Sequence, residues 1–453
     1  MTEKIVIIGG GAAGPKIMAK LLRSEGDRQI DMYTEEEIIS YSACGMPYYI
    51  EGLIDNYRRL IVRTPQQFEE KGARVHLNKK CIRIVPEEKK VILEDTKTGE
   101  ITTAEYDKLA YTTGARPTIP PINNVHLKNV FTLRHIEDCI NIKETMLGSK
   151  KAVIVGGGYI GIEMLEAFVV NDLKVHLVER GEHILSVFDP EISDMIKTYI
   201  EKVSASQVEI TTNDAVIAFV GDEKVEQVIT QSGRIIDTDF VIIAVGVTPN
   251  TEVAREAGIE LGVSNAIRVN HRMQTNLPDV YAAGDCIENF HLVSRSYVWI
   301  PLGSSANKEG RCAAINMSGQ YEVFPGVLGS AVTRYIGYTM SITGLNEQDA
   351  KKAGFDVITS VTTKNDRAGY MPQSEDITIK LIVDKRSKKI LGAQAIGNGD
   401  ADKRINTIAS AIMADETIDD FLHLDMTYAP PYSTAIDPVL AAAIVIYNNL
   451  KKS

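Results

Sequence analysis

The chain has 453 residues, of which 44% are hydrophobic and 24% are charged, and its formal net charge is −11. This composition is typical of a globular protein with enough apolar residues for roughly two to four domains. It argues against a nucleic-acid partner, because the charge balance is acidic and no basic run stands out.

The start of the chain and its cysteines indicate a cytoplasmic protein. The first residues lead directly into an apolar strand, and no apolar run approaches the roughly 18 residues that cross a bilayer. The five cysteines, Cys44, Cys81, Cys139, Cys286 and Cys312, have neither the spacing of a disulfide framework nor that of a zinc site. We therefore expect a reducing compartment, no membrane association and no bound metal.

A glycine-rich turn follows the first strand. In KIVIIGGGAAGPKIMAKLL, apolar residues 5–8 lead into Gly9, Gly11 and Gly14, and a helical pattern follows. In such a turn the first glycine allows a tight bend and the second lets a pyrophosphate approach the backbone. The third lets helix and strand pack closely. The pattern predicts that a dinucleotide binds here.

The same pattern occurs a second time. Gly156, Gly158 and Gly161 each stand 147 positions after their counterparts in the first turn. The strand that follows ends at Glu179, eighteen residues after the last glycine, where an acid is expected to bond the adenosine ribose. Two copies predict two bound dinucleotides.

The first copy lacks an acid at the matching place. Thr34 ends its second strand, and Glu35 and Glu36 follow. Either glutamate could reach the ribose after a small shift, and Thr34 could bond it more weakly. We assign the contact to Glu35.

Three later segments complete a family pattern. TTGARP contains Thr113 and Gly114, VGVTPN contains Gly246, and AAGD ends in Gly284 and Asp285, whose carboxylate is placed to accept from ribityl hydroxyls. With the two glycine turns, these motifs resemble the FAD-dependent pyridine nucleotide-disulfide oxidoreductase superfamily over essentially the whole chain. The resemblance implies that the first turn and AAGD hold FAD, and that the second turn holds NAD(P)H.

The resemblance also implies a domain organisation. We expect an α/β fold with two Rossmann-like dinucleotide-binding domains and an α+β C-terminal dimerisation domain. The FAD domain would comprise residues 1–120 and 247–325, interrupted by an NAD(P)H domain at 121–246. Residues 326–453 would form the dimerisation domain, which implies a homodimer.

The stretch SYSACGMPYYIEG places a lone cysteine, Cys44, at the start of a helix. Relatives with two redox cysteines carry CxxxxC here, and Tyr49 at the second position excludes an internal dithiol. The segment instead resembles the single-cysteine branch: coenzyme A-disulfide reductases, persulfide and polysulfide reductases, and NADH oxidases and peroxidases. Pro47 suits the first turn of a helix, so we expect free N–H groups and the helix dipole to lower the pKa of the Cys44 thiol.

Two tyrosines match places at which coenzyme A-disulfide reductases bring a phenol from the partner subunit to the cysteine. These are Tyr370 in RAGYMP and Tyr432 in YAPPYS, with Tyr428 a weaker match. A phenol can hydrogen-bond a departing thiolate and donate a proton to it. Both tyrosines are also compatible with an ordinary packing role.

Coenzyme A needs local cations for its phosphates. Lys16, Lys20 and Arg23 stand at i, i+4 and i+7 on the first predicted helix, and such a stripe is either a solvated face or a phosphate site. Arg23 matches a family position that lines the coenzyme A channel. We assign Lys20 and Arg23 to substrate binding.

Residues of the second glycine turn match family positions beside the nicotinamide. Tyr159 resembles the gate that covers the flavin, and Glu163 an amide or ribose contact. Glu179 favours NADH, although the adjacent Arg180 could tolerate the 2′-phosphate of NADPH. We expect FAD and NADH, or NADPH, as cofactors.

Together these features predict an NAD(P)H-dependent reductase of coenzyme A disulfide or of a coenzyme A persulfide or polysulfide. One alternative is an NADH oxidase or peroxidase that cycles through cysteine sulfenic acid. Ala12 counts against it, because those enzymes carry a histidine at this place. The other alternative is an NADH-binding flavoprotein that signals redox state.

Overall fold

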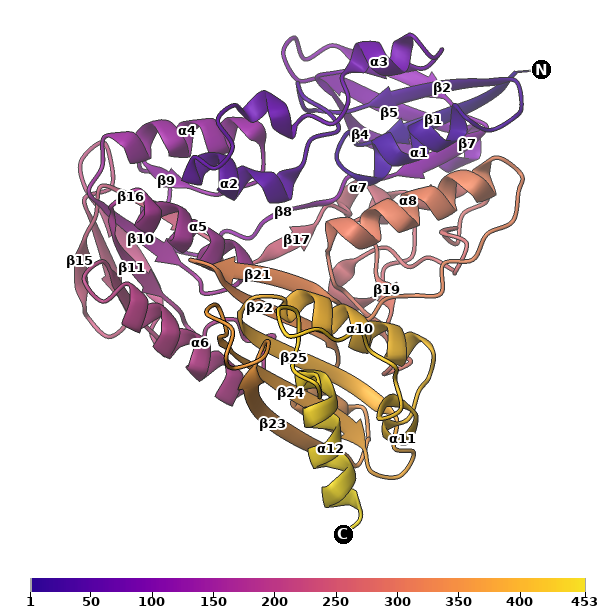
Figure 1. Cartoon of the computed structure of the whole chain (residues 1–453). Helices are drawn as coiled ribbons and strands as arrows, with labels where there is room; N and C mark the ends of the chain where they lie inside the picture. Colours follow the sequence, from indigo (N-terminus) through magenta and orange to yellow (C-terminus); the bar gives the residue numbers. More distant parts are fainter. Residues whose placement is uncertain (1, 453) are drawn as a thin grey trace.

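The first unit of the computed structural model, which describes residues 2–452, is a parallel sheet in the order β18-β7-β1-β2-β3 (Figure 1). Its strands are β1 (Glu3–Ile8), β2 (Arg28–Tyr33), β3 (Arg74–His76), β7 (Lys108–Tyr111) and β18 (Val280–Ala282). The apolar runs predicted as strands are buried on both faces, as a parallel sheet requires. Because β18 pairs with β7, a segment from late in the sequence completes the sheet of this first unit.

Helices α1 (Ala13–Leu21) and α8 (Gly303–Met317) pack against each other beside this sheet (Figure 1). A Cβ on Gly310 would come within 2.8 Å of Ala13 O, so the two helices approach as closely as a glycine allows. An antiparallel sheet of β4 (Lys79–Val85), β5 (Lys90–Asp95) and β6 (Ile101–Glu105) completes the unit.

The second unit repeats the plan, with a parallel sheet in the order β12-β11-β10-β16-β9. Its strands are β9 (Val130–Phe131), β10 (Lys151–Val155), β11 (Lys174–Val178), β12 (Val208–Thr211) and β16 (Phe240–Ile243), and its helices are α4 (Ile136–Leu147), α5 (Tyr159–Val170) and α6 (Pro190–Val203). A small antiparallel sheet contains β13 (Val216–Val220), β14 (Gln227–Thr230) and β15 (Ile235–Asp237). The chain enters and leaves this unit through β8 (Ala115–Pro117) and β17 (Val247–Pro249), which pair with each other.

The C-terminal unit is an antiparallel sheet in the order β21-β22-β25-β24-β23. Its elements are β21 (Ala331–Tyr335), β22 (Tyr338–Gly344), α9 (Glu347–Lys352), β23 (Val357–Asn365), β24 (Asp376–Asp384), β25 (Ile390–Asn398), α10 (Ala401–Met413), α11 (Ile418–Phe421) and α12 (Pro438–Leu450). Helices α10, α11 and α12 share a core with β24 and β25.

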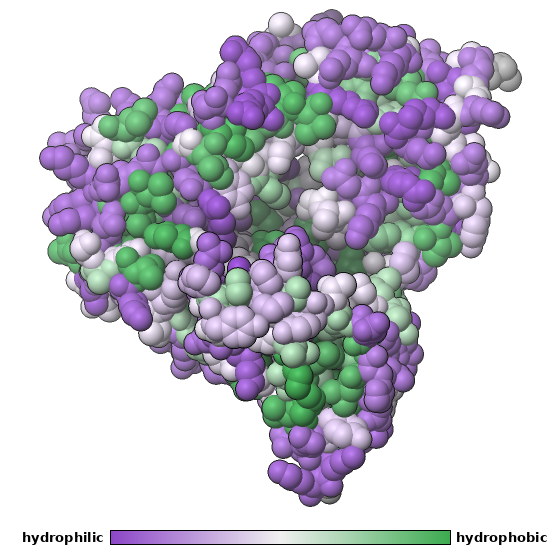
Figure 2. Space-filling model, viewed as in Figure 1, coloured by the Kyte–Doolittle hydropathy of each residue, from purple (hydrophilic) through white to green (hydrophobic). Residues whose placement is uncertain are grey.

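One hydrophobic core joins three parts of the chain that are distant in sequence. It contains Met46 and Ile50 from α2 (Met46–Glu51), Phe168 from α5, and Tyr335 and Met340 from the C-terminal sheet. The short helix that follows Cys44 is therefore anchored to both later units. The surface is hollowed where the three units meet (Figure 2).

The α/β fold class predicted from the sequence is confirmed by the two parallel sheets and the separate C-terminal sheet. The exact domain boundaries, at residues 120, 246 and 325, stay predictions. Across residues 2–452, every helix is too short or too polar to cross a membrane.

Candidate functional site

In the first glycine turn, the backbone segments pack too closely for any side chain at two of the three glycines. Gly9 has φ +110°, and a Cβ there would lie 2.3 Å from Thr112 O. A Cβ on Gly14 would lie 2.1 Å from Gly9 O, so only glycine lets α1 start this close to β1. By contrast, a Cβ on Gly11 would meet no atom within 4 Å. Gly11 thus faces open space in front of the helix, where a pyrophosphate fits.

The second turn has the same construction. A Cβ on Gly156 would lie 2.5 Å from Ala244 O, one on Gly161 would lie 2.1 Å from Gly156 O, and one on Gly158 would meet nothing within 4 Å. Glu179 follows β11 and accepts from Gly157 N at 2.7 Å and from Gly181 N at 2.6 Å. Its carboxylate is thereby fixed beside the turn, where a ribose of a bound dinucleotide would lie.

The acidic residues after β2 are placed differently. Thr34 is buried and is the counterpart of Glu179, since a Cβ on Gly10 would lie 3.0 Å from Thr34 Oγ1. Glu35, which we had assigned to the ribose, is exposed and lies 3.5 Å from Lys80 Nζ. The Glu36 carboxylate already has a partner within the protein, because it accepts a hydrogen bond from the Tyr41 hydroxyl at 2.6 Å. Glu35 is therefore the freer of the two glutamates, and its role stays a prediction.

The AAGD segment turns at Gly284, which has φ +88°. Burial raises the pKa of Asp285, and no residue between 2 and 452 donates a hydrogen bond to its carboxylate. A half-buried carboxylate without a protein donor suits the ribityl hydroxyls of FAD. Behind it, Glu309 of α8 accepts from Gly284 N and from Asn289 Nδ2, both at 2.8 Å, and burial raises the pKa of Glu309 to about 7.

Thr113, Gly114 and Gly246 lie where the chain crosses between the two units. Thr113 Oγ1 donates to Asn250 O at 2.7 Å, and Thr118 N donates to Gly246 O at 2.9 Å. These bonds hold the entering and leaving segments together, so both dinucleotide-binding units keep a fixed relation to each other.

Sequence reasoning missed Arg134 in this region. A Cβ on Gly114 would lie 3.0 Å from Arg134 Nη2. The guanidinium charge partly offsets the burial that raises the pKa of Asp285, and it adds to the hydrogen bonds of His135 and Tyr41 that lower the pKa of Glu36. Because it lies among these groups, Arg134 is suited to neutralise a phosphate of a bound dinucleotide. Arg134 stands two residues before α4, and the sequence around it gave no signal for this role.

Cys44 lies in a 3-10 turn, Ala43–Gly45, just before α2. Its side chain is exposed, and a Cβ on Gly303 at the start of α8 would lie 3.9 Å from Cys44 Sγ. The sulfur therefore faces the N-terminus of a 15-residue helix, and the charges of Asp285 and Glu163 act on it. We call the region between Cys44, Asp285 and Glu163 the cleft.

The expected lowering of the Cys44 pKa is wrong for this structure. Loss of hydration raises the pKa of the thiol, and the carboxyls of Glu163 and Asp285 raise it further. The amides that we expected to face the sulfur are used within the turn. Gly45 N donates to Ser42 O at 3.0 Å, and Met46 N donates to Ala43 O.

Tyr159 and Glu163 lie one turn apart on α5, which packs against α2. Burial raises the pKa of Glu163 to about 7, and Glu166 adds to the effect. Burial also raises the pKa of Tyr159. Glu163 is thus near enough for its charge to act on Cys44, and Tyr159 lies one turn before it on the same helix.

Arg334 of β21 is a second residue that the sequence did not reveal. Its Nη2 lies 3.1 Å from both carboxylate oxygens of Glu51, and its Nε lies 3.3 Å from Glu166 Oε2. The guanidinium carbon also lies 5.2 Å from the centre of the Tyr48 ring. One side chain of the C-terminal unit thus ties α2, the helix that follows Cys44, to α5.

Tyr370 and Tyr432 are not brought to Cys44 within one chain. Both side chains are 76% exposed, on two neighbouring loops of the C-terminal unit. Ala368 N donates to Pro430 O at 3.2 Å, and Arg404 bridges the loops by donating to Asp366 O at 2.7 Å. The two phenols therefore project from the same part of the surface.

Lys20 and Arg23 lie at the end of α1, where Arg23 falls in the turn after the helix rather than on it. This corrects the predicted stripe, because the helix ends at Leu21. Neither side chain forms an ion pair with any residue that the structure describes, and the same holds for Lys16 on α1 and Lys308 on α8. The cations are free to meet an anionic ligand.

Comparison with known proteins agrees with this arrangement. Residues 3–310 match the family model of pyridine nucleotide-disulphide oxidoreductases, and residues 330–439 match that family's dimerisation domain. The NAD(P)H coenzyme A polysulfide/persulfide reductase of Pyrococcus horikoshii is 36% identical over 98% of this chain and 99% of its own length. An NADH oxidase of Methanocaldococcus jannaschii is 33% identical over 97% of this chain and 98% of its own length.

Among solved structures, reduced CoADR-RHD of Bacillus anthracis superposes with a TM-score of 0.96 at 34% identity and covers 100% of this chain and 81% of that protein. The open glycine turns and the unpaired Asp285 carboxylate fit the two dinucleotides that the motifs predicted. The chain therefore belongs to the pyridine nucleotide-disulphide oxidoreductases, a family of enzymes that use FAD and NAD(P)H.

Proposed function

We propose that this protein is a homodimeric NAD(P)H-dependent reductase of coenzyme A disulfide, or of a coenzyme A persulfide or polysulfide. The observation that carries the proposal is the placement of one thiol. Of the cysteines in residues 2–452, Cys44 is exposed and the other four are buried. It faces the cleft that contains Asp285 and Glu163, between the two dinucleotide-binding units. Five free cysteines also suit a reducing, cytoplasmic setting.

The chemistry follows from a single redox cysteine. The Cys44 thiolate attacks one sulfur of the substrate disulfide, a bond forms between the two sulfurs, and the other half leaves as a thiolate that takes up a proton. FAD, when bound, supplies the electron pair of NAD(P)H that frees the second thiol and restores Cys44. With a persulfide, the same attack takes the outer sulfur and leaves a coenzyme A thiol.

The cations of α1 and α8 support a phosphorylated substrate. Lys16 and Lys20 lie on α1, Arg23 lies in the turn after it, and Lys308 lies on the adjacent α8. None of the four forms an ion pair within residues 2–452. Coenzyme A carries three phosphate groups, and lysine and arginine bind phosphate through charge-assisted hydrogen bonds. An otherwise acidic protein needs such a local group of cations for this ligand.

The C-terminal unit supports the homodimer. Apolar side chains gather over the region of α12 (Figure 2), where Ile436 is 55% and Val445 38% exposed. Large exposed apolar surface beside protruding tyrosines is typical of a subunit interface. We propose that Tyr370 and Tyr432 enter the partner's cleft, where a phenol protonates the thiolate that leaves.

The experiment is turnover of the purified holoenzyme with NADH and coenzyme A disulfide. The wild type and a Cys81→Ala control should release free thiol, whereas Cys44→Ser should not. In parallel, mass spectrometry of the protein isolated without reductant should show a coenzyme A adduct on the Cys44 peptide.

Two other results would replace the proposal. An oxygen adduct on Cys44, with NADH-driven oxygen uptake faster than thiol release, would indicate an oxidase like the archaeal relative. Slow turnover with every small disulfide, with a conformational response to NADH, would indicate redox signalling.

A further inference from the structure

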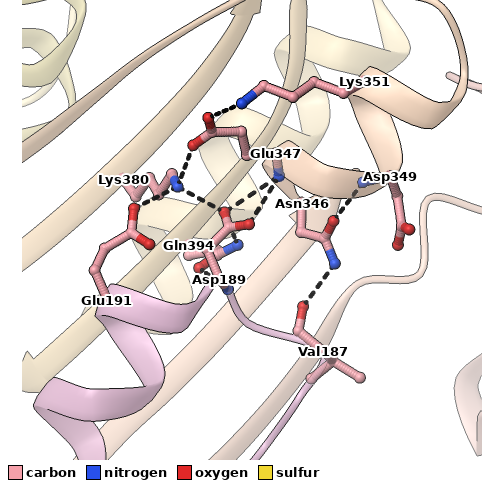
Figure 3. Close-up of polar contacts among 9 residues, drawn as sticks. All are labelled: Val187, Asp189, Glu191, Asn346, Glu347, Asp349, Lys351, Lys380 and Gln394. Carbon is pink, nitrogen blue, oxygen red and sulfur yellow. Dashed lines mark hydrogen bonds and ion pairs between the residues drawn. The ribbon is translucent and has the colours of Figure 1, made fainter. Parts of the chain in front are cut away.

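A buried cation joins the second unit to the C-terminal unit. Lys380 lies on β24, and its side chain is only 1% exposed. Its Nζ lies 3.0 Å from Asp189 Oδ2, 2.5 Å from Glu191 Oε1 and 2.7 Å from Glu347 Oε2 (Figure 3). Burial alone would lower the pKa of Lys380, but the bonds to the three carboxylates outweigh it, so the pKa is raised and the lysine stays charged.

Two of these carboxylates belong to the second unit, which we expect to bind NAD(P)H. Asp189 precedes α6 and Glu191 lies in its first turn, whereas Glu347 belongs to α9 of the C-terminal unit. Asp189 Oδ2 also accepts from Gln394 Nε2 at 2.7 Å, and Asn346 Nδ2 donates to Val187 O at 3.3 Å. Figure 3 shows that these contacts surround the start of α6 from the side of the C-terminal sheet.

The same segment touches the second glycine turn at its other end. Leu185 N donates to Gly157 O at 2.7 Å, and a Cβ on Gly157 would lie 2.9 Å from Ile184 Cγ2. Leu185 has φ +45°, a left-handed conformation that a leucine adopts only when its surroundings hold it. Residues 184–191 therefore form a short strut between the glycine turn and Lys380.

We propose that Lys380 is a positioning residue for reduction of the enzyme by NAD(P)H. By fixing the strut, it sets the distance of the second glycine turn, and of Tyr159 behind it, from the cleft that contains Cys44. Hydride transfer needs reacting atoms about 3–3.5 Å apart, so a shift of about 1 Å at the turn slows it strongly. The inference rests on the proposed function only in taking NAD(P)H as the electron donor.

The test separates the two halves of the reaction in the FAD-loaded dimer. Flavin reduction by NADH is followed in single turnover, and the KM for NADH is measured with ferricyanide as electron acceptor. Separately, dithionite-reduced enzyme is reoxidised by coenzyme A disulfide. For Lys380→Met we expect flavin reduction about tenfold slower and a higher KM for NADH, with reoxidation within about twofold of wild type.

Matched variants control for charge and for folding. Lys385→Met removes an exposed lysine of the same unit that pairs with Asp356 at 3.3 Å, and it should leave both half-reactions unchanged. Glu191→Gln breaks a contact that crosses between units at a half-exposed side chain, so it keeps the test valid even if Lys380→Met does not fold. It should slow flavin reduction about threefold, whereas Glu347→Gln, which breaks a contact within the C-terminal unit, should have a smaller effect.

The proposal is overturned if Lys380→Met or Glu191→Gln reduces the flavin at the wild-type rate. It is also overturned if both half-reactions fall by the same factor, because a merely structural residue would act on both. Failure of wild-type enzyme to be reoxidised by coenzyme A disulfide would reject the proposed substrate instead and leave the NADH–ferricyanide measurement valid.

Discussion

Arg334 and Glu51 are 283 residues apart in the sequence, yet Arg334 Nη2 lies 3.1 Å from each carboxylate oxygen of Glu51. Glu51 is the last residue of α2, the helix that begins two residues after Cys44. We therefore expect the position of the Cys44 thiol to depend on a side chain from the C-terminal unit.

Replacing Arg334 tests this dependence. Arg334→Met leaves Glu51 and the buried Glu166 without their cation, so we expect about 2 kcal/mol less stability in urea unfolding of the holoenzyme, together with slower disulfide turnover. Arg334→Lys keeps the positive charge but lacks the planar guanidinium, so it should recover only part of the stability and of the turnover. Full activity in Arg334→Met would show that α2 needs no such anchor.

The charge of Glu163 gives a pH-dependent prediction. Its pKa is raised to about 7, so Glu163 is mainly protonated below that pH and carries its charge above it. Because this charge adds to the burial that raises the pKa of Cys44, Glu163→Gln should lower the pKa of the thiol, with the difference developing only above about pH 7.

The measurement is the pH dependence of iodoacetamide alkylation of Cys44 in the two-electron-reduced enzyme. The control is Glu201→Gln, which removes a carboxylate paired with Lys197 on the exposed side of α6. An alkylation midpoint in Glu163→Gln equal to that of wild type would contradict the assigned coupling.

The glycine turns were predictable because their requirements are local. A strand, a helix and three glycines at fixed spacing are all visible within twenty residues, and the close approach of Gly14 to Gly9 O explains why no other residue fits. The fold class followed from two such units in one chain.

The electrostatics of the site could not be predicted in this way. The pKa of Cys44 depends on Glu163 and Asp285, which reach it from α5 and from the turn after β18. Arg334 and Lys380 likewise find their partners only after the units have packed together. Such contacts leave no periodic signal in the sequence, so local reasoning about the helix gave the wrong sign for the thiol.

Glu179 should set the choice of nicotinamide cofactor. Its carboxylate is fixed by Gly157 N and Gly181 N, where it would accept from ribose hydroxyls and repel a 2′-phosphate. We expect kcat/KM to favour NADH over NADPH, and Glu179→Ser to reduce that preference about tenfold, which corresponds to roughly 1.4 kcal/mol. Glu182→Ser, at an exposed neighbouring position, is the control. A wild-type preference for NADPH would refute the assignment.

Lys20 and Arg23 should matter only for a phosphorylated substrate. The double variant Lys20→Ala, Arg23→Ala loses two unpaired cations, so the KM for coenzyme A disulfide should rise about tenfold. Pantetheine disulfide has the same reactive sulfurs without the nucleotide phosphates, and its turnover should not change. If both substrates are affected equally, the residues act on the fold of α1 rather than on the phosphates.

Tyr432 should act on the cleft of the other subunit. Because its side chain projects from the C-terminal unit and does not reach Cys44 of its own chain, Tyr432→Phe should lower kcat about tenfold or more, while Tyr428→Phe serves as the control.

Mixed dimers decide which subunit supplies the phenol. A dimer of one Cys44→Ser chain and one Tyr432→Phe chain has one complete cleft only if the tyrosine crosses the interface. It should then recover about half of the wild-type turnover, whereas a tyrosine that acts within its own chain leaves both clefts impaired. The same pairing with Tyr370→Phe tests the second phenol.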